Sequence, residues 1–106
     1  MSTKVTVIYD NPTDPVLFEK VYGDAQISLV RALPGLESLE TSKVWPKDGS
    51  VTPAYRMIDM YFANYEAASS AVTTPEATAL FSSVFDLATG GVRILFSNIE
   101  ETRTDR

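Results

Sequence analysis

Histidine and cysteine are both absent from this chain of 106 residues. Without imidazole or thiol groups, most routes to metal binding, thiol chemistry and acid–base catalysis near neutral pH are closed. Lysine and arginine number 9 against 14 aspartates and glutamates, which gives a formal net charge of −5. These charges are scattered, so no basic surface for a phosphate backbone is expected. We expect no metal, no cofactor and no nucleic-acid partner.

Long apolar runs are lacking too. No segment approaches the roughly 20 apolar residues that cross a bilayer, and residues 1–7 contain no apolar stretch of signal-peptide type. We therefore expect a soluble, cytoplasmic protein that has no membrane partner. Hydrophobic residues still make up 44% of the chain, which is enough for a core without disulfides or a structural metal. Residues 1–106 are expected to form a single domain.

The first third of the chain predicts a strand, a turn and an amphipathic helix. Residues 4–9 alternate between two faces and are rich in β-branched side chains, as in a strand. Asp14 is placed to cap the helix that follows, and Pro15 occupies its first position, where a missing N–H is harmless. We interpret Asp14 as a cap rather than a catalytic acid. The helix should end at Pro34-Gly35. Its predicted apolar stripe is Phe18, Tyr22, Ala25, Leu29 and Leu33.

The same signals divide the rest of the chain into strands and helices. The elements are expected at residues 36–45 (strand), 54–62 (strand), 65–72 (helix), 75–88 (helix) and 92–100 (strand). The first of these strands should contain an irregularity between Leu39 and Val44 and form an antiparallel hairpin with the next. Asn64 should cap one helix, and Pro75 should begin the other. The apolar face of the second helix is predicted as Phe81, Val84, Phe85 and Ala88. A polar tail, 101–106, follows.

This order of elements predicts an α+β fold: a ferredoxin-like βαββαβ sandwich whose antiparallel four-stranded sheet has helices on one face. The strands nevertheless look apolar on both sides. In residues 55–62, for example, Met57 and Tyr61 alternate with Ile58 and Met60. A chain of this size has helices for only one face, and an exposed apolar face is normally covered by a partner. We therefore predict a homodimer packed sheet on sheet.

Several motifs together resemble the EthD-like family of the dimeric α+β barrel superfamily. They are Tyr9-Asp10-Asn11-Pro12-x-Asp14-Pro15-x-x-Phe18-Glu19-x-x-Tyr22, Leu33-Pro34-Gly35-Leu36, Thr74-Pro75-Glu76 and Gly90-Gly91-Val92. The resemblance covers most of the chain. It implies a dimeric α+β barrel with a small pocket between sheet and helices in each subunit. The wider superfamily includes cofactor-free monooxygenases, lactone isomerases and polyketide cyclases.

The chain departs from the family at one position of the first helix. The family usually carries Tyr-x-x-x-His-x-Pro-Leu there, which aligns with Tyr22, Gln26, Ser28 and Leu29. Gln26 thus stands where the family has histidine. Glutamine donates and accepts hydrogen bonds but cannot exchange a proton near neutral pH. An imidazole-dependent mechanism and histidine ligation of haem are both disfavoured.

Tyr22 and Gln26 lie one helical turn apart and should share a surface, with Gln26 toward the edge of the apolar stripe. They are either an ordinary core tyrosine and boundary glutamine, or a polar pair that orients a carbonyl or phenol-like ligand. The remaining candidate substrate-binding residues are aromatic: Tyr9, Phe18 and Tyr61. We interpret Arg31, Arg56 and Arg93 mainly as surface or pairing residues. The other aromatic residues, Trp45, Phe62, Phe81, Phe85 and Phe96, are interpreted as core.

Asp59 is unusual because it lies within an apolar strand. Burial of its charge without a partner would cost several kcal/mol, so Asp59 must be exposed, paired or protonated. By alternation it shares a face with Tyr61 and not with Arg56. A dimer-interface ion pair or hydrogen bond explains it. Alternatively, in a dry cavity a raised pKa would make it the best general base of the chain.

Two functions stay open. The first is a cofactor-free enzyme acting on an apolar or aromatic metabolite as an oxygenase, isomerase or cyclase. Proton transfer would then fall to Asp59 or a tyrosine such as Tyr22, with Gln26 orienting the substrate. The second is a non-catalytic binding or accessory protein that has lost the family histidine.

Overall fold

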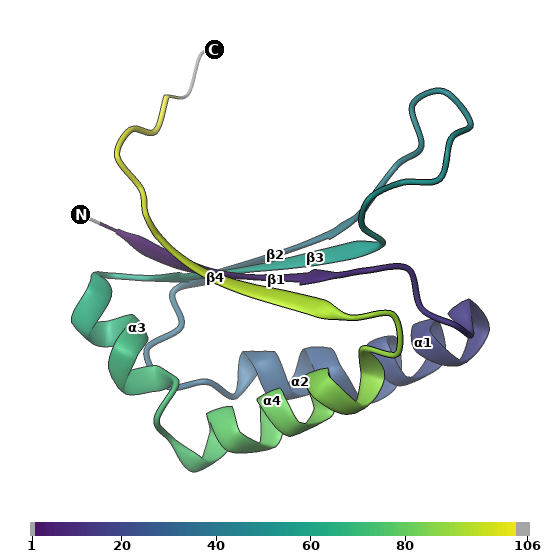
Figure 1. Cartoon of the computed structure of the whole chain (residues 1–106). Coiled ribbons are helices and arrows are strands. Elements are labelled where there is room, and N and C mark those ends of the chain that lie inside the picture. The colour runs from purple at the N-terminus through teal and green to yellow at the C-terminus, as the bar shows by residue number, and fades with distance from the viewer. Residues whose placement is uncertain (1, 104–106) are drawn as a thin grey trace.

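The computed structural model describes residues 2–103. Its helices and strands are β1 (Thr3–Tyr9), α1 (Pro15–Val21), η1 (Tyr22–Gln26), α2 (Ile27–Arg31), β2 (Ser38–Lys43), β3 (Arg56–Phe62), α3 (Tyr65–Ala71), α4 (Pro75–Leu87) and β4 (Val92–Asn98). The four strands form one antiparallel sheet in the order β2-β3-β1-β4. All helices lie on one face of this sheet (Figure 1). The predicted ferredoxin-like α+β fold is confirmed.

The core lies between this sheet and the helices. Alternate residues of the central strand β1, Val5, Val7 and Tyr9, are at most 1% exposed. In the register of the sheet, Val5 is paired with Met60 and Val7 with Ile58, so these side chains share one face. That face carries the apolar positions of β1 and β3, which the helices bury.

The first helical segment differs from the prediction at one turn. Its middle part, η1, is a π-helical turn in which the Ile27 N–H donates to the Tyr22 carbonyl five residues earlier. A π turn holds an additional residue, so the buried positions after it shift along the chain by one. The buried positions are Phe18, Tyr22, Gln26, Val30 and Leu33. The predicted stripe was wrong at Ala25, which is exposed, whereas Leu29 packs partly buried against the core. Gln26 lies within the buried face rather than at its edge.

Side-chain caps begin three of the helices as the sequence predicts. Asp14 accepts from the Leu17 N–H at 3.1 Å at the start of α1. Asn64 and Thr74 cap α3 and α4 in the same way. Such caps typically stabilise a helix by about 0.5–2 kcal/mol each. Local sequence signals therefore place these helix starts correctly.

The predicted apolar face of α4 was partly wrong. Phe85, which the prediction placed on that face, is 61% exposed. The buried residues of α4 are Ala77, Leu80, Val84 and Leu87. Their spacing of three and four residues is helical, and their small and aliphatic side chains pack closely against the neighbouring elements. Of the predicted positions, Val84 is buried and Phe81 and Ala88 pack partly buried against the core, so only Phe85 was wrongly placed.

The strands keep the predicted order, but β2, β3 and β4 are shorter than predicted. β2 and β3 form the predicted antiparallel hairpin in continuous register from Ser38 opposite Tyr61 to Lys43 opposite Arg56, so the predicted irregularity in β2 is absent. β4 ends at Asn98, and residues 101–103 of the predicted tail belong to no helix or strand. Residues 104–106 lie outside the described part. Within residues 2–103 no helix has the length and apolar character to cross a membrane.

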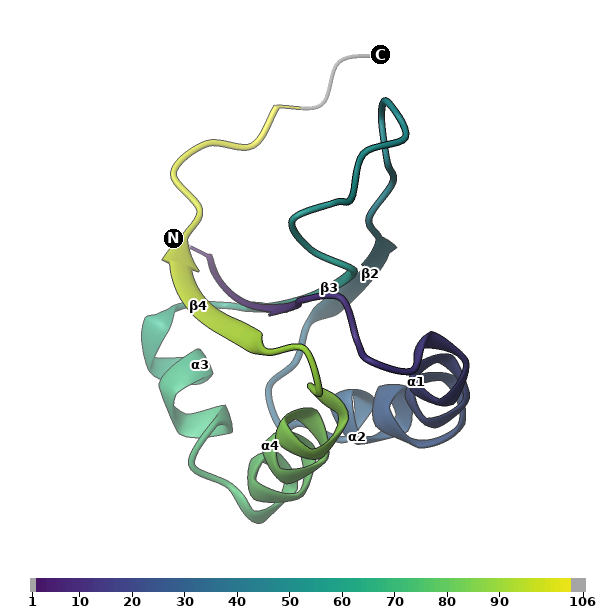
Figure 2. The same cartoon turned by 45° about the vertical axis from the view of Figure 1, so that its right-hand side comes forward.

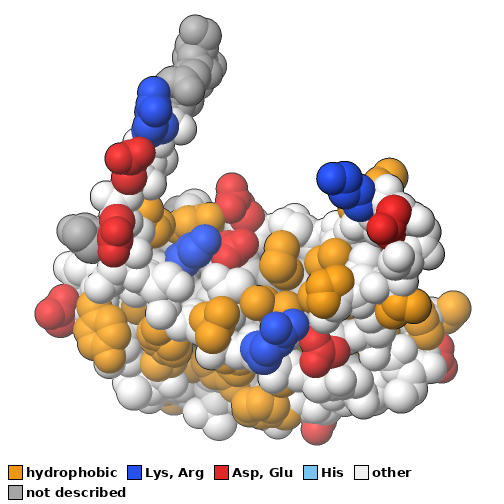
Figure 3. Space-filling model, turned by 45° about the horizontal axis from the view of Figure 1, so that its top comes forward, with side chains coloured by type: hydrophobic (Ala, Val, Ile, Leu, Met, Phe, Trp, Pro, Cys, Tyr) orange, Lys and Arg blue, Asp and Glu red, His pale blue; other side chains and the backbone are white. Residues whose placement is uncertain are grey.

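The sheet face away from the helices, here called the open face, is mixed in character. Its side chains include Lys4, Thr6 and Ile8 of β1, Glu40 of β2, Met57, Asp59 and Tyr61 of β3, and Arg93 and Leu95 of β4. In Figure 3 hydrophobic side chains on this side of the molecule are interrupted by charged ones. The expectation that both faces are uniformly apolar therefore needs correction: charged residues belong to the open face.

Two segments project from the sheet on the side of the open face. They are residues 44–55 and residues 99–103, which rise opposite the helices in both views (Figures 1 and 2). The loop carries Trp45 and Val51, whose side chains are 85% and 90% exposed. The open face is therefore flanked by chain segments that extend beyond the sheet.

Candidate functional site

A cleft of about 480 Å³ lies between α1 and α4. Its walls are lined by Thr13, Asp14, Leu17, Phe18 and Val21 on one side and by Ala79, Ser82, Ser83, Asp86, Leu87 and Thr89 on the other. The Thr13 N–H donates to Thr89 Oγ1 at 3.0 Å and ties the two walls together. Leu17 is 56% exposed, so this wall reaches the outer surface. The cleft is apolar along α1 and carries hydroxyl groups along α4.

A chain of hydrogen bonds leads from the sheet to this cleft. The Tyr9 hydroxyl donates to Gln26 Oε1, and Gln26 Nε2 donates to Ser83 Oγ at 3.2 Å. Tyr9 and Gln26 are 0% exposed. Burial raises the pKa of the Tyr9 hydroxyl well above its ordinary value, so this group stays protonated and serves as a donor. Since Ser83 Oγ accepts from Gln26, its own hydrogen is free to donate into the cleft.

The orientation of the Gln26 amide follows from the burial of Tyr9. With the amide reversed, its NH₂ group would face the Tyr9 hydroxyl, and the hydroxyl hydrogen would lose its acceptor. An unsatisfied buried donor costs about 1–3 kcal/mol, so the observed orientation is preferred. The π turn makes this arrangement possible because it directs Gln26 toward the sheet.

Phe18 joins the cleft to the core. Its ring lies edge-on to the rings of Tyr9 and Tyr55, with centroid distances of 4.9 and 5.2 Å, and stacks on Tyr22 at 5.7 Å. Three of the predicted substrate-binding residues, Tyr9, Phe18 and Gln26, are thus brought together beside one cleft. These three residues therefore lie close together in the structure.

Tyr22 lies next to this group but does not line the cleft. Its ring covers the guanidinium of Arg56 at 4.7 Å, and Arg56 forms a two-pronged pair with Glu19 at 2.6 and 2.8 Å. The Tyr22 hydroxyl is buried beside Thr41 and Arg56 and has no hydrogen-bond partner within residues 2–103. Burial raises the pKa of this hydroxyl. Tyr22 therefore points toward the β2–β3 side of the molecule.

Asp59 and Tyr61 lie on the open face, on the other side of the sheet from the cleft. Thr6 Oγ1 donates to Asp59 Oδ1 at 2.6 Å, and Lys4 Nζ lies 3.8 Å from the same oxygen. Of the three states predicted for Asp59, the paired one is therefore observed. The Tyr61 hydroxyl donates to Glu40 at 2.5 Å, which raises the pKa of Tyr61 to about 12. Neither side chain is brought to Gln26.

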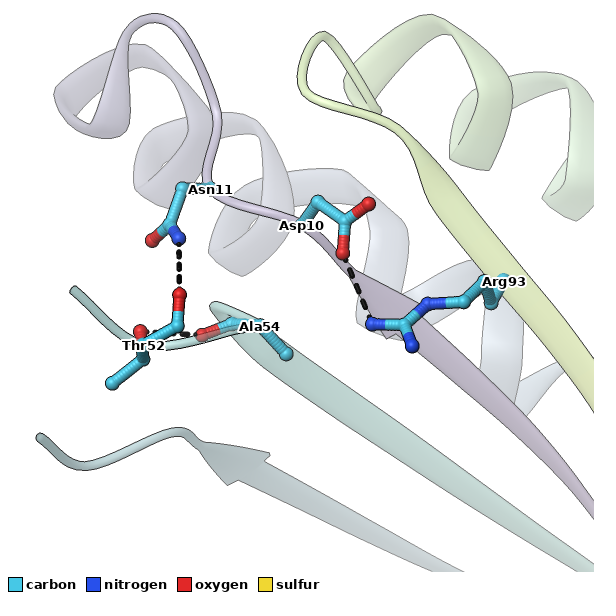
Figure 4. Close-up of polar contacts among 5 residues, drawn as sticks. All are labelled: Asp10, Asn11, Thr52, Ala54 and Arg93. Atoms are coloured by element: carbon cyan, nitrogen blue, oxygen red, sulfur yellow. Dashed lines mark hydrogen bonds and ion pairs between the residues drawn. The ribbon is translucent and has the colours of Figure 1, made fainter.

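The remaining arginine and aromatic candidates also lie away from the cleft. Arg93 pairs with Asp10 at 3.1 Å, as Figure 4 shows at the end of β1. Beside this pair, the Asn11 side chain donates to the Thr52 carbonyl at 2.8 Å and holds the projecting loop (Figure 4). None of the aromatic residues interpreted as core lines the cleft, and that interpretation was wrong for Trp45, Phe85 and Phe96, which are exposed. Across residues 2–103, no group of three or more Asp or Glu side chains is arranged to hold a metal ion.

The sequence did contain a signal for Ser83, which the prediction missed. Ser83 lies three residues after Leu80 and four before Leu87, so this polar residue interrupts the buried stripe of α4. A serine in such a position needs a hydrogen-bond partner. That partner, Gln26, is 57 residues away along the chain. The sequence contains no comparable signal for Asp86, which also lines the cleft.

Known proteins are similar to this chain in sequence and in fold. No model of a protein family matches the sequence. An uncharacterized 11.0 kDa protein of Rhodococcus erythropolis, from the thcB-thcC intergenic region, is 32% identical over 99 residues, which are 93% of this chain and 95% of the relative. An ethyl tert-butyl ether D (EthD) family protein of Bacillus halodurans superposes with a TM-score of 0.87 and 22% identity, covering 93% and 99% of the two chains.

Two further structures share the fold at lower identity. A protein of Bacteroides fragilis, described as dimeric, of unknown function and ferredoxin-like in fold, has a TM-score of 0.67 and 13% identity, covering 92% and 96% of the two chains. SnoaB of Streptomyces nogalater, described as a cofactor-independent oxygenase, has a TM-score of 0.62 and 15% identity, covering 98% and 97%. The chain belongs to the family of the Rhodococcus protein, and its fold is the EthD-like, ferredoxin-like fold that its motifs predict.

Proposed function

We propose that this protein binds a small apolar or aromatic metabolite in the cleft between α1 and α4, and that it works as a homodimer. The cleft volume of about 480 Å³ lies in the range of about 300–1,000 Å³ that is typical of small-molecule sites. Leu17, Val21 and Leu87 supply an apolar lining, and hydroxyl groups supply a few polar contacts. Such a combination suits a compact ligand with one hydrogen-bond acceptor.

The observation that carries this proposal is the hydrogen-bond chain from Tyr9 through Gln26 to Ser83. A buried glutamine at 0% exposure requires partners for its amide, and one of these partners lines the cleft. These hydrogen bonds leave the Ser83 hydroxyl as a donor toward a ligand oxygen, such as that of a carbonyl, ether or phenol. Gln26 takes this orienting role at the position where the family pattern has histidine.

The apolar residues of the open face support the proposed homodimer. Ile8, Met57 and Leu95 give this face an apolar component, and Leu95 is 49% exposed. The two projecting segments would enclose the edges of a second sheet packed on it (Figure 1). The Bacteroides protein with the same fold is described as dimeric, which agrees with this arrangement.

Catalysis without a cofactor is the second candidate function. SnoaB, which has the same fold, is described as a cofactor-independent oxygenase. Asp14 and Asp86 supply ionisable groups within the cleft. In such a step the hydroxyl donor would polarise a ligand carbonyl, while a carboxylate opposite it accepts a proton from the carbon next to that carbonyl. The catalytic roles predicted for Tyr22 and Asp59 remain predictions, and that of Asp59 would require the open face to form part of a site.

The proposal is tested with 4-ethylacetophenone, a neutral aryl ketone, titrated into isotope-labelled protein and followed by NMR. We expect the amide signals of Leu17, Val21 and Ser83 to shift and to saturate. Ser83→Ala should weaken binding about five-fold, because one hydrogen bond is worth about 1 kcal/mol. Ser82→Ala is the matched control, since Ser82 lines the same cleft but is not the serine that Gln26 contacts.

Two results would decide against the proposed site. Shifts confined to residues outside the cleft would show that the ketone binds elsewhere. An equal loss of affinity in the two serine variants would show that the hydrogen bonds from Tyr9 through Gln26 to Ser83 do not orient the ligand. Leu17→Trp, which fills the cleft from an exposed position, should abolish the shifts. In D₂O the same sample reports catalysis, because faster exchange of the acetyl protons with wild-type protein than with Ser83→Ala would indicate enolisation.

A further inference from the structure

Among the residues that the structure describes, those lining the cleft carry charge of one sign only. Its lining includes the carboxylates Asp14 and Asp86 and neither lysine nor arginine. Both aspartates are exposed, so they lie at the rim of the cleft, whereas Phe18 and the hydrogen-bonded Ser83 lie deeper. A ligand whose acceptor reaches Ser83 would therefore direct its other end toward these carboxylates.

The two carboxylates differ in how far the fold compensates their charge. Asp14 caps α1, and one of its oxygens accepts the Leu17 N–H at 3.1 Å. Asp86 is the residue before the end of α4, where the unpaired carbonyls of the last turn carry a partial negative charge. No basic residue occurs in the last turn of α4. The negative potential at the rim is therefore strongest on the α4 side.

We infer that the cleft selects its ligand by charge: it takes neutral or positively charged molecules and rejects carboxylates. This inference rests on the proposed function, because it concerns the same cleft. A carboxylate entering beside Asp86 meets like charge from the side chain and from the helix end, whereas an ammonium group meets the opposite charge. The net charge of −5 acts in the same direction at longer range.

Three probes with the same aryl ketone body test the inference. They are 4-(hydroxymethyl)acetophenone, which is neutral, 4-(aminomethyl)acetophenone, which is cationic, and 4-acetylbenzoate, which is anionic. We expect the amine to bind at least as tightly as the alcohol. The benzoate should bind roughly 25-fold more weakly than the amine, as two exposed charge interactions of about five-fold each would give. The difference should shrink in 0.5 M salt.

Asp86→Asn is the decisive variant, because replacing Asp14 would also remove a helix cap. It should bring the affinities of amine and benzoate closer by about five-fold and change the affinity of the alcohol by much less. Asp24→Asn is the matched control: Asp24 is exposed on η1 and does not line the cleft, and its substitution changes the net charge by the same amount.

The possible outcomes separate the inference from the proposed function. If the alcohol shifts the cleft amides but the benzoate binds equally well, the charge selection is wrong and the binding site stands. If Asp86→Asn and Asp24→Asn change the amine-to-benzoate ratio equally, overall charge explains the ratio and the inference is overturned. If the alcohol produces no shifts at the cleft, the proposed function fails, and the inference fails with it.

Discussion

The two faces of the sheet differ in the way they hold polar groups, although their residues alternate along the same strands. On the helix-covered face, Tyr9 and Gln26 are 0% exposed and bond to each other within an apolar core. On the open face, Asp59 is held by Thr6 and Lys4, which belong to the neighbouring strand of the same sheet. On the covered face Tyr9 thus bonds to a residue of the helical layer, whereas on the open face Asp59 is paired within the sheet.

This difference indicates two separate tasks. Polar groups that connect sheet and helix can reach a cleft on the helical side, as Gln26 does through Ser83. Polar groups bonded within the sheet, as Asp59 is to Thr6 and Lys4, lower the desolvation cost of packing a second sheet on this face. The proposed ligand binding would therefore take place on the helical side, and the proposed self-association on the open face.

The largest expected effect contrasts neighbouring residues of β3. Ile58 is 0% exposed beneath the helices, whereas Met57 lies on the open face. Ile58→Ala should lower the free energy of unfolding by about 2–5 kcal/mol, because it leaves a cavity in the core. Met57→Ala should cost less than about 1.5 kcal/mol in dilute protein, where a partly exposed side chain has little burial to lose.

Urea unfolding at two protein concentrations measures both effects. The cost of Met57→Ala should increase with concentration if the open face is a dimer interface, because association stabilises the folded state by mass action. The cost of Ile58→Ala should be large at both concentrations. Equal costs for the two variants in dilute protein would contradict the distinction between a covered and an open face.

An intermediate effect is expected from a charge placed on the open face. Leu95 is 49% exposed on β4, and Leu95→Asp would bring two like charges into a sheet-on-sheet interface. Such burial costs several kcal/mol, so the dimer should weaken roughly 100-fold or more. Light scattering after size-exclusion chromatography should then give the monomer mass. Val16→Asp, at an 82% exposed position of α1, should leave the dimer intact. A monomeric wild-type protein would refute the proposed interface.

The order of elements was predictable because its signals are local. Asp14, Asn64 and Thr74 each bond to a backbone N–H three residues later, and such caps can be recognised from a few neighbouring residues. Gly90 could be recognised as a helix stop for a similar reason. Its backbone approaches Asn11 so closely that a Cβ atom would lie 1.9 Å from the Asn11 carbonyl oxygen.

The site was less predictable because its contacts are distant along the chain. The π turn at Tyr22–Gln26 has no strong sequence signature, and without it Gln26 appears at the edge of a regular helix. Its partner Ser83 comes from another helix. Alternation correctly placed Asp59 and Arg56 on different faces of β3. Because both faces of β3 carry apolar residues, alternation alone cannot identify the face that the helices cover.

The smallest expected effect concerns the other charged residue of β3, Arg56. Arg56 bonds to Glu19 on α1, and this hydrogen bond holds the pKa of the Glu19 carboxyl below its ordinary value. A carboxyl whose pKa is lowered by folding stabilises the protein above its unfolded-state pKa, and the stabilisation is lost as the pH falls through the folded-state value. Because Glu19 is partly exposed, we expect no more than about 1 kcal/mol.

Unfolding measurements between pH 7 and pH 3 can resolve this contribution. Glu19→Gln should be less stable than wild type at pH 7, and the difference should disappear at acid pH, where the wild-type carboxyl is protonated as well. Glu101→Gln removes the same charge from a residue outside the helices and strands and serves as the control. A Glu19→Gln difference that stays constant across this range would show that the ion pair does not link α1 to the sheet in solution. The covered face would then hold α1 through Phe18 and its aromatic neighbours alone.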